Sequence, residues 1–452
     1  MNLTHGWLPT AIQVLTAVVL MVAIGWRSRR WRMLWVPVAI LTGVALAALV
    51  YWYLGDQGWS QDSAPPILWL WVALTGLAAV VAVVGWPGLA WWRRGASVLA
   101  IALCMICVAL GVNFWVGYFP TVQSAWDRAI GAEPERWIDQ STLADMRSRG
   151  ERPTKGVVVK VTIPDDASGF LHREELVYLP PAWFATTPPP RLPVVMAIGG
   201  AYGHPDNLLR LADGLDALDN FTARHRGNAP VMVFPDSQGR FSNDTECVNG
   251  TRGNAADHLT KDVVPFVISN FGTSSDPANW GLAGWSAGGT CALMLAVMHP
   301  ELFSTFVDID GQLGPNAGTD EQTIERLFGG DAAAWASFDP KTVVTRHGPY
   351  TGMSAWFAVS VDTPTVYREG RDAPDAPQPE WFSFSDDHVR IANTLCSFVS
   401  NYGIECAVVS TPDSHDFQGA GAAFNAALPW LAGKIGTPGV SRIPLPGAPA
   451  KQ

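Results

Sequence analysis

Four long apolar stretches before residue 120 constrain this chain more than any other feature of its sequence. Each is about as long as the 20 residues with which a helix crosses the hydrocarbon core of a bilayer, and none contains a charged side chain. Trp and Tyr collect near their ends, as at membrane–water interfaces. Buried helices of a soluble protein are the alternative, but consecutive apolar runs this long are rare there. The sequence predicts four transmembrane helices: Leu8 to Trp26, Met33 to Leu54, Ile67 to Trp86 and Ser97 to Tyr118.

The charges between these stretches predict their orientation. The second loop contains Asp56 and Asp62 and no Lys or Arg. Positively charged residues lie in the first and third loops: Arg27, Arg29, Arg30, Arg32, Arg93 and Arg94. Because loops rich in Arg stay in the cytoplasm, the N-terminus and everything after Tyr118 are expected outside it. The first stretch does not read as a cleaved signal peptide, because no basic segment precedes it.

The remaining chain has an ordinary globular composition. With 452 residues the protein is long enough for two or more folding units. We expect a membrane region over residues 1–118, a connector over 119–154, a soluble domain over 155–432 and a disordered tail over 433–452. The net charge of −10 argues against nucleic-acid binding, which needs clustered Lys and Arg. No Cys/His cluster has the spacing of a zinc site, and no cofactor or structural metal is expected.

The periodicity of the soluble part indicates an α/β fold. Residues 157–163 and 171–179 alternate in polarity as an antiparallel pair of strands. A continuous apolar run, Leu192 to Ile198, is suited to a buried strand. Strand-like and helix-like segments then alternate as far as a helix over residues 420–431. This order predicts a mostly parallel central sheet covered by helices on both faces.

The stretch Trp280 to Thr290 contains the pattern Gly-x-Ser-x-Gly around Ser286. Strand-like residues precede this serine and helix-like residues follow it, which is the setting of a nucleophile elbow. The flanking glycines fit a bend too tight for a Cβ atom. Because Gly is abundant in this chain, the pattern alone is a weak signal, and the strand and helix around it make Ser286 the candidate nucleophile.

A serine nucleophile needs a general base and an acid that orients it, in the chain order Ser, Asp or Glu, His. The candidate base is His415, on the loop after the last predicted strand, whereas His172 and His299 lie in an early hairpin and at the end of the helix after Ser286. The favoured acid is Asp362, directly after the strand over residues 355–361. Its competitors are Asp310, after the preceding strand, and Asp386 or Asp387, which also suit a helix N-terminus.

The oxyanion formed in such a reaction needs two backbone N–H groups. Ala287, the residue after the nucleophile, is expected to supply one. The other is expected from the Gly-rich turn after Ile198, at Ala201 or Tyr202. A plain tight loop is the alternative reading of that turn, because glycine is common at the ends of strands.

These motifs together resemble the family of esterases that includes esterase D (S-formylglutathione hydrolase), feruloyl esterases and actinobacterial mycolyltransferases. The resemblance covers about residues 155–432 and rests on the Ser286 elbow, the following His299-Pro300-Glu-Leu-Phe303, the strand at Val231 to Pro235, and His415-Asp416-Phe417. It implies an α/β-hydrolase fold and assigns Ser286, His415 and Asp362 as nucleophile, base and acid. It also implies that residues 241–247 line the mouth of the active site.

Two departures from the family pattern stand out. Residues 368–380, rich in Pro and charge, are an insertion that forms a candidate lid. Around Cys396, where mycolyltransferases carry their acid on a helix, this chain has no carboxylate. The second departure weakens the hypothesis that this chain is specifically a mycolyltransferase.

The six cysteines divide into two groups. Cys104 and Cys107 lie in the fourth apolar stretch and are read as packing residues. The other four face an oxidising compartment in the predicted topology, so pairing is expected, with Cys247–Cys291 and Cys396–Cys406 as the candidate pairs.

The leading hypothesis is a membrane-anchored, extracytoplasmic serine esterase whose substrates are lipid or cell-envelope esters. An acyltransferase that moves the acyl group to a sugar acceptor shares the first half of this chemistry and is the second hypothesis. A non-catalytic envelope scaffold is the third. The sequence does not disclose the acyl chain, the alcohol, protein partners or the oligomeric state.

Overall fold

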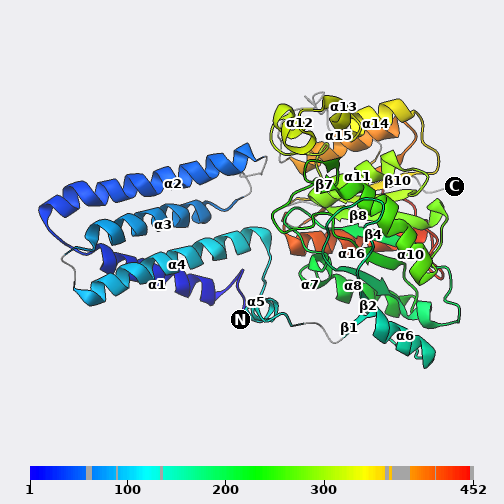
Figure 1. Ribbon diagram of the computed structural model, residues 1–452, viewed down its shortest axis with the longest axis horizontal. Helices are drawn as coiled ribbons and strands as arrows, with labels where there is room; N and C mark the ends of the chain where they lie inside the picture. The colour runs from blue at the N-terminus through cyan, green and yellow to red at the C-terminus, as the bar shows by residue number, and fades with distance from the viewer. Residues whose placement is uncertain are drawn as a thin grey trace. The chain divides into compact units, whose positions relative to one another are not determined.

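The computed structural model describes residues 1–57, 64–87, 90–132, 136–361, 366–368, 387–412 and 414–447. The chain forms two compact units, Met1–Ala132 and Glu133–Gln452. The first is helical, and the second is built around one large sheet (Figure 1).

The first unit contains the four expected apolar helices, each long and apolar enough to cross a membrane. They pack in the order α1, α4, α3, α2, and a glycine lies at the contact of the last two. A Cβ atom on Gly43 would lie 2.2 Å from the carbonyl oxygen of Ala73, so the two helices approach too closely for a larger residue. The elements are α1 (Trp7–Ile24), the π-helical turn η1 (Trp31–Trp35), α2 (Val36–Asp56), α3 (Pro66–Gly85), α4 (Trp91–Val116) and the short α5 (Val122–Ala129).

The second unit contains a mostly parallel ten-stranded sheet in the order β1-β2-β3-β5-β4-β8-β9-β10-β12-β11. From β5 to β12 all neighbours run parallel, while β3 is antiparallel to both of its neighbours and β11 is antiparallel to β12. The strands are β1 (Trp137–Asp139), β2 (Val157–Val161), β3 (Glu175–Leu179), β4 (Val194–Ile198), β5 (Val231–Phe234), β8 (Trp280–Trp285), β9 (Thr305–Ile309), β10 (Ser354–Ser360), β11 (Val366–Arg368) and β12 (Glu405–Thr411).

Helices cover both faces of this sheet, since every residue of β4, β5, β8 and β9 is buried. One group of helices, α16 with α7 and α8, packs together, and α16 lies on β8, β9, β10 and β12. Another includes α11, which lies on β4, β8 and β9 and contacts α14, and α15, which lies on β10 and β12. The predicted α/β-hydrolase architecture is therefore present.

The helical elements of the second unit are α6 (Gln140–Ser148), η2 (Pro181–Phe184), α7 (Asn207–Arg210), α8 (Gly214–Arg224), α9 (Ala255–Asp257), η3 (His258–Val263), α10 (Val264–Phe271), η4 (Pro277–Asn279), α11 (Ala287–Met298), α12 (Asp320–Phe328), α13 (Ala332–Ala336), α14 (Pro340–His347), α15 (His388–Ser400) and α16 (Phe417–Lys434). Two strands of two residues each, β6 (Asn249–Gly250) and β7 (Gly253–Asn254), form a hairpin that is not part of the main sheet.

The structure differs from the sequence expectations at both ends of this unit. The sheet begins inside the expected connector, because β1 pairs in parallel with β2. At the other end, residues of the expected disordered tail pack on the domain as far as Leu445, which is buried together with Ile435 and Thr437. A few apolar residues within this Pro- and Gly-rich stretch make the contacts. The prediction of disorder used the average composition of the stretch, in which these single residues do not stand out.

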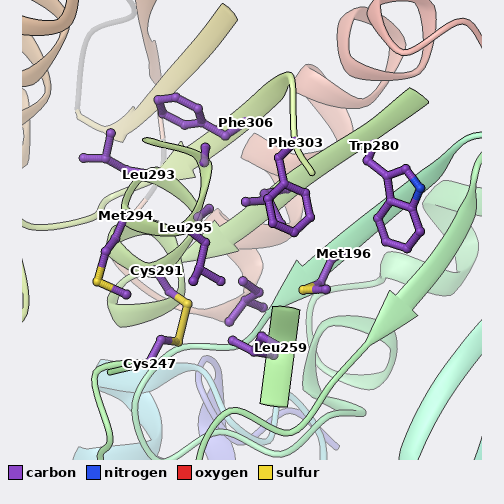
Figure 2. Close-up of a cluster of buried hydrophobic side chains, with 14 of the residues drawn as sticks. Met196, Cys247, Leu259, Trp280, Cys291, Leu293, Met294, Leu295, Phe303 and Phe306 are labelled. Atoms are coloured by element: carbon purple, nitrogen blue, oxygen red, sulfur yellow. A yellow bond between two sulfur atoms is a disulfide. The ribbon is translucent and has the colours of Figure 1, made fainter. Parts of the chain in front are cut away.

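Both candidate disulfides are present in the structure. Cys247 and Cys291 are bonded, which ties the loop after β5 to the first turns of α11 inside the main core (Figure 2). Cys396 and Cys406 join α15 to β12. Cys104 and Cys107 are free and buried on α4, where packing is the role expected of them.

Candidate functional site

Ser286 lies at the sharp turn between β8 and α11. Its backbone is in the left-handed region, with φ 57°, and its N–H donates to the carbonyl oxygen of Ile309 at 2.8 Å. A Cβ atom on Gly284 would lie 1.9 Å from the carbonyl oxygen of Gly288, and one on Gly288 would lie 2.3 Å from that of Ile198. Both glycines are therefore required by close backbone approach, and the strand–turn–helix geometry expected of the Gly-x-Ser-x-Gly pattern is present. Ser286 itself is half-buried.

His415 lies on the loop after β12, beside this turn. Its imidazole ring is 5.1 Å from the ring of Trp285, the residue before Ser286, and Trp285 also contacts Phe417 at 4.8 Å. The ring of His388, the first residue of α15, stacks on His415 at 4.7 Å with an interplanar angle of 1°. The aromatic contact with Trp285 thus brings His415 to the elbow.

The carboxylate that faces His415 is that of Asp310, just after β9. Asp310 Oδ2 is 3.3 Å from His415 Nδ1, and the Asp310 side chain is fully buried. Ser360 donates to Asp310 twice, from its backbone N–H at 2.8 Å and from its hydroxyl at 2.6 Å. These contacts leave the carboxylate held by donors on one side and by the imidazole on the other.

The favoured sequence candidate, Asp362, lies outside the described residues, as does Asp386. Asp387 caps α15, where its side chain accepts from the backbone N–H of Arg390 at 2.9 Å. Of the four carboxylates considered from the sequence, Asp310 is the one that an observed contact connects to His415.

Two aspartates around the end of β9 have pKa values shifted in opposite directions. Burial pushes the pKa of Asp310 upwards, but the contact with His415, the charges of His415 and His388 and the Ser360 hydroxyl together hold that pKa below its usual value. No cation among the described residues stabilises the charge of Asp308 in this way. Burial raises the pKa of Asp308 to about 8, and the charge of Asp310 adds to the rise, against one hydrogen bond from the Gly311 N–H. Asp310 is therefore built to be ionised and Asp308 to be neutral.

The Gly-rich turn after β4 lies against the elbow. A Cβ atom on Gly200 would lie 3.1 Å from the carbonyl oxygen of Trp285 and 3.3 Å from the Cβ of Ser286. Tyr202 has a left-handed backbone, with φ 55°. Ala201 and Tyr202 are both half-buried, as is Ala287 on the first turn of α11. The three predicted oxyanion residues thus belong to two segments that meet at Ser286.

Two side chains that sequence reasoning missed hold this turn in place. Gln238 Nε2 donates to the carbonyl oxygen of Gly200 at 2.7 Å. Arg173 Nη2 donates to the carbonyl oxygen of Gly203 at 3.0 Å, and the same guanidinium binds Asp236 at 2.6 and 2.9 Å. The position of Asp236 just after a buried strand was a signal available in the sequence, because carboxyl ends of strands gather at the site of such folds.

The segment expected to line the mouth lies next to the same turn. The ring of Phe241 is 5.8 Å from that of Tyr202. Further along, Glu246 is buried and accepts from the backbone N–H of Asn316 at 3.2 Å. Burial and the neighbouring carboxyl of Asp244 raise the pKa of Glu246 well above its usual value.

Among the described residues, two groups of side chains offer ligand atoms close enough together to hold a metal ion: Asp310, His388 and His415, and His172, Glu175 and His258. In the second group His258 Nε2 lies 2.9 Å from Glu175 and His258 Nδ1 lies 3.3 Å from Asp262. Burial lowers the pKa of His258, but the two carboxylates outweigh it and the net shift is upwards. Because a carboxylate faces each ring nitrogen of His258, this group reads as a buried ion cluster.

Comparison with known proteins agrees with this architecture. Residues 172–357, which include Ser286 and Asp310 but not His415, match the family model described as putative esterase. The chain is 28% identical over 368 residues to an uncharacterized protein of Corynebacterium glutamicum, with 77% of this chain and 82% of that protein covered.

Solved structures with a similar fold include a ferulic acid esterase, at 14% identity and a TM-score of 0.45, over 62% of this chain and 99% of that one. An S-formylglutathione hydrolase from Agrobacterium tumefaciens is similar at 15% identity and a TM-score of 0.46, over 62% of this chain and 95% of that one. The chain thus carries, after its four apolar helices, a segment over residues 172–357 that matches the model of the putative-esterase family.

Proposed function

We propose that this domain is a serine ester hydrolase that works through an acyl-enzyme, with Ser286 as nucleophile, His415 as general base and Asp310 as the acid. The observation that carries the proposal is the meeting of three loops: Ser286 in its left-handed turn, His415 on the ring of Trp285, and Asp310 Oδ2 at 3.3 Å from His415 Nδ1. A buried, ionised carboxylate at Nδ1 fixes the tautomer that leaves Nε2 able to accept a proton.

The reaction begins when Ser286 Oγ attacks the carbonyl carbon of the ester and its proton passes to His415. The tetrahedral intermediate collapses as His415 returns that proton to the leaving alcohol, which leaves the acyl group on Ser286. Water then repeats the sequence, losing a proton to His415 and releasing the carboxylic acid. Asp310 stays ionised throughout and stabilises the imidazolium, which its depressed pKa favours.

Backbone N–H groups stabilise the negative charge that develops on the carbonyl oxygen. Ala287 at the start of α11 is one donor, and the turn containing Ala201 and Tyr202 is the other. Gly200 supports this role because a Cβ atom there would lie 3.3 Å from the Cβ of Ser286, so the turn comes close to the nucleophile. Gln238 and Arg173, which hold the carbonyls of Gly200 and Gly203, keep the turn rigid.

The enzyme is proposed to be anchored in a membrane with its domain outside the cytoplasm. Four helices are long and apolar enough to span a bilayer, and the arginines between them favour that orientation. The two disulfides of the domain support it, because such bonds persist in oxidising compartments. Proximity to a bilayer makes esters of lipids or of the cell envelope the proposed substrates.

The test is labelling of the purified full-length protein by a fluorophosphonate probe, together with turnover of a p-nitrophenyl ester. Ser286→Ala should abolish both, while Ser269→Ala, on the exposed side of α10, should leave both unchanged. Labelling that survives in Ser286→Ala would refute the assignment of the nucleophile. Product analysis with a lipid ester and added sugars then separates hydrolysis from transfer, since a hydroxyl acceptor replaces water only in the second half-reaction.

A further inference from the structure

One end of the four-helix unit concentrates arginines. They lie between α1 and α2 and at the start of α4, and we call them the arginine end: Arg27, Arg29, Arg30, Arg32, Arg93 and Arg94. In Figure 1 this is the end at which α1 passes into α2 and α3 into α4. The end of α2 and the start of α3 lie at the opposite end of the helices.

No carboxylate is encoded near this end. The acidic residues among the first 132 residues are Asp56, Asp62 and Asp127. Asp56 is the last residue of α2 and Asp127 lies on α5 beyond α4, so both belong to the opposite end of the helices. Within the described part of the chain no salt bridge involves any residue of the arginine end. Six positive charges therefore lie together without a counter-ion among the described residues.

Two of these arginines reach across to other helices. Arg27 Nη1 lies close to Gly85, the last residue of α3. A Cβ atom on Gly85 would be 2.5 Å from this nitrogen. Arg93 Nη1 lies correspondingly 3.1 Å from the Cβ position of Gly25, just after α1. Arg27 also donates to the carbonyl oxygen of Ala23 at 2.6 Å. The two guanidinium groups thus meet between the ends of α1, α3 and α4.

The meeting of these two cations is not compensated. Burial and then the charge of Arg93 lower the pKa of Arg27, which is the direction expected when no anion is near. The Nε atoms of Arg27 and Arg94 are buried, and no described residue forms a hydrogen bond with either of them. Each such donor costs free energy when it is removed from water unpaired.

The helix dipoles do not supply the missing charge. Each helix end carries about half an elementary charge, negative at a C-terminus and positive at an N-terminus. At the arginine end α1 and α3 finish while α2 and α4 begin, so two partial negative charges oppose two partial positive ones. The sum is close to zero, and the positive charge of the guanidinium groups remains.

Tryptophan rings hold the guanidinium planes. Arg27 lies over Trp31 at 3.9 Å and Arg32 over Trp26 at 4.5 Å, and Arg93 and Arg94 lie 5.0 and 5.5 Å from Trp92 and Trp86. Trp side chains favour the headgroup level of a bilayer, where phosphate groups also lie. The rings restrict the arginines and add no negative charge of their own.

We propose that Arg27 and Arg93, at the arginine end, bind the phosphate group of an anionic phospholipid. A guanidinium pairs with phosphate through two parallel hydrogen bonds, which at Arg27 would use the unpaired Nε donor. The acyl chains would lie along the apolar faces of the helices, so that a headgroup is favoured over a free ion. The site is independent of the chemistry at Ser286.

The experiment measures the thermal unfolding midpoint and the lipid retained in native mass spectrometry. Purified full-length protein in detergent is titrated with phosphatidylglycerol, with phosphatidylcholine and with inorganic phosphate. Three double variants are compared: Arg27→Gln with Arg93→Gln, Arg27→Lys with Arg93→Lys, and the matched control Arg29→Gln with Arg30→Gln, whose side chains are exposed. The first and third remove the same charge.

Phosphatidylglycerol is expected to raise the wild-type midpoint and to be retained in preference to phosphatidylcholine. The affinity should fall about ten- to a hundredfold in the Arg27/Arg93 glutamine variant, as expected for lost charge-assisted hydrogen bonds, and should change little in the control. The lysine variant keeps the charge but loses the planar guanidinium group, so its affinity for phosphatidylglycerol should lie between those of the two glutamine variants. It also tests the site if the Arg27/Arg93 glutamine variant does not fold. Equal losses in the two glutamine variants, or no preference for phosphatidylglycerol by the wild type, would overturn the proposal. A matching effect of inorganic phosphate would overturn the choice of a lipid.

Discussion

Asp310 and Asp308 stand two residues apart at the end of β9, and their surroundings give them opposite protonation states. Asp310 has an imidazole and a hydroxyl as partners, so its carboxylate is stabilised. Asp308 is enclosed by backbone, with Gly289 and Gly311 packed against its oxygens. Side-chain environment, and not residue type, therefore separates the two.

Replacement of Asp310 tests its role against that of Asp362. Asp310→Asn should lower kcat by about a thousandfold or more, because the base loses the carboxylate that fixes its tautomer and stabilises its charged form. Asp362→Asn should leave kcat within a few-fold of wild type. The measurement is steady-state hydrolysis of a p-nitrophenyl ester. The reverse ranking of the two variants would restore the assignment made from sequence order.

Replacement of Asp308 tests the raised pKa through stability. Between the unfolded pKa near 4 and the folded pKa of about 8, the folded state holds a proton that the unfolded state releases. The free energy of unfolding therefore falls as pH rises through this window, at up to about 1.4 kcal/mol per pH unit. Asp308→Asn mimics the neutral acid, keeps the oxygen that accepts from Gly311, and should remove this slope.

Unfolding midpoints of the full-length protein at pH 5, 6, 7 and 8 provide the measurement. The gain of Asp308→Asn over wild type should grow steadily with pH and be largest at pH 8. The exposed Asp145→Asn on α6 serves as the control and should follow the wild type. A constant difference at all four pH values would show that Asp308 ionises normally.

At the scale of elements, the turn after β4 depends on side chains from other segments for its shape. Gln238→Met keeps the volume but removes the donor to the carbonyl oxygen of Gly200. The proposed oxyanion donors at Ala201 and Tyr202 would then move relative to Ser286. We expect kcat to fall roughly tenfold to a hundredfold with little change in KM, because the loss concerns the transition state. Equal loss of kcat/KM through KM alone would argue against this role.

The two disulfides should differ in their contribution to stability. The bond between Cys247 and Cys291 closes a loop of 44 residues, and that between Cys396 and Cys406 closes one of 10. Loop-closure entropy gives about 4 kcal/mol for the first and about 3 kcal/mol for the second. Replacing each pair by alanine and measuring the midpoint of denaturant unfolding should rank them in this order. The opposite ranking would mean that packing around the sulfur atoms outweighs chain entropy.

At the scale of the whole molecule, the proposed topology places the domain outside the cytoplasm. A reporter that is active only outside the cytoplasm should be active when fused after Gln452 and inactive when fused after Arg94, because the arginine end is expected to stay inside. Inactivity of the fusion after Gln452 would place the domain in the cytoplasm. The disulfide prediction would then fail with it, since thiols remain reduced there.

The prediction of the fold from sequence succeeded where the signal is local. Apolar length identified the four helices, period two identified the β2–β3 pair, and glycine spacing identified the turn at Ser286. It did not find β1, a three-residue strand whose pairing with β2 joins it to the sheet. A strand that short carries no periodicity, so only its partner defines it.

The site was predictable in the same uneven way. Ser286 and His415 follow from a motif and from a position after the last long strand, which are properties of the sequence itself. The sequence does not decide among Asp310, Asp362, Asp386 and Asp387, because all four satisfy the required chain order. The sequence also does not predict that Arg173, Gln238 and His388 contact the site, because they reach it from three separate segments.

By itself, then, the sequence determined the apolar helices, the alternation of strands and helices, the elbow serine and the pairing expected of the cysteines, because each depends on composition or spacing along the chain. Only the tertiary structure decided that Asp310 faces His415 and that Gln238 and Arg173 hold the turn beside Ser286. The physical reason is the order of strands in the sheet, which brings the carboxyl ends of β4, β8, β9 and β12 together and so selects which loops share one site.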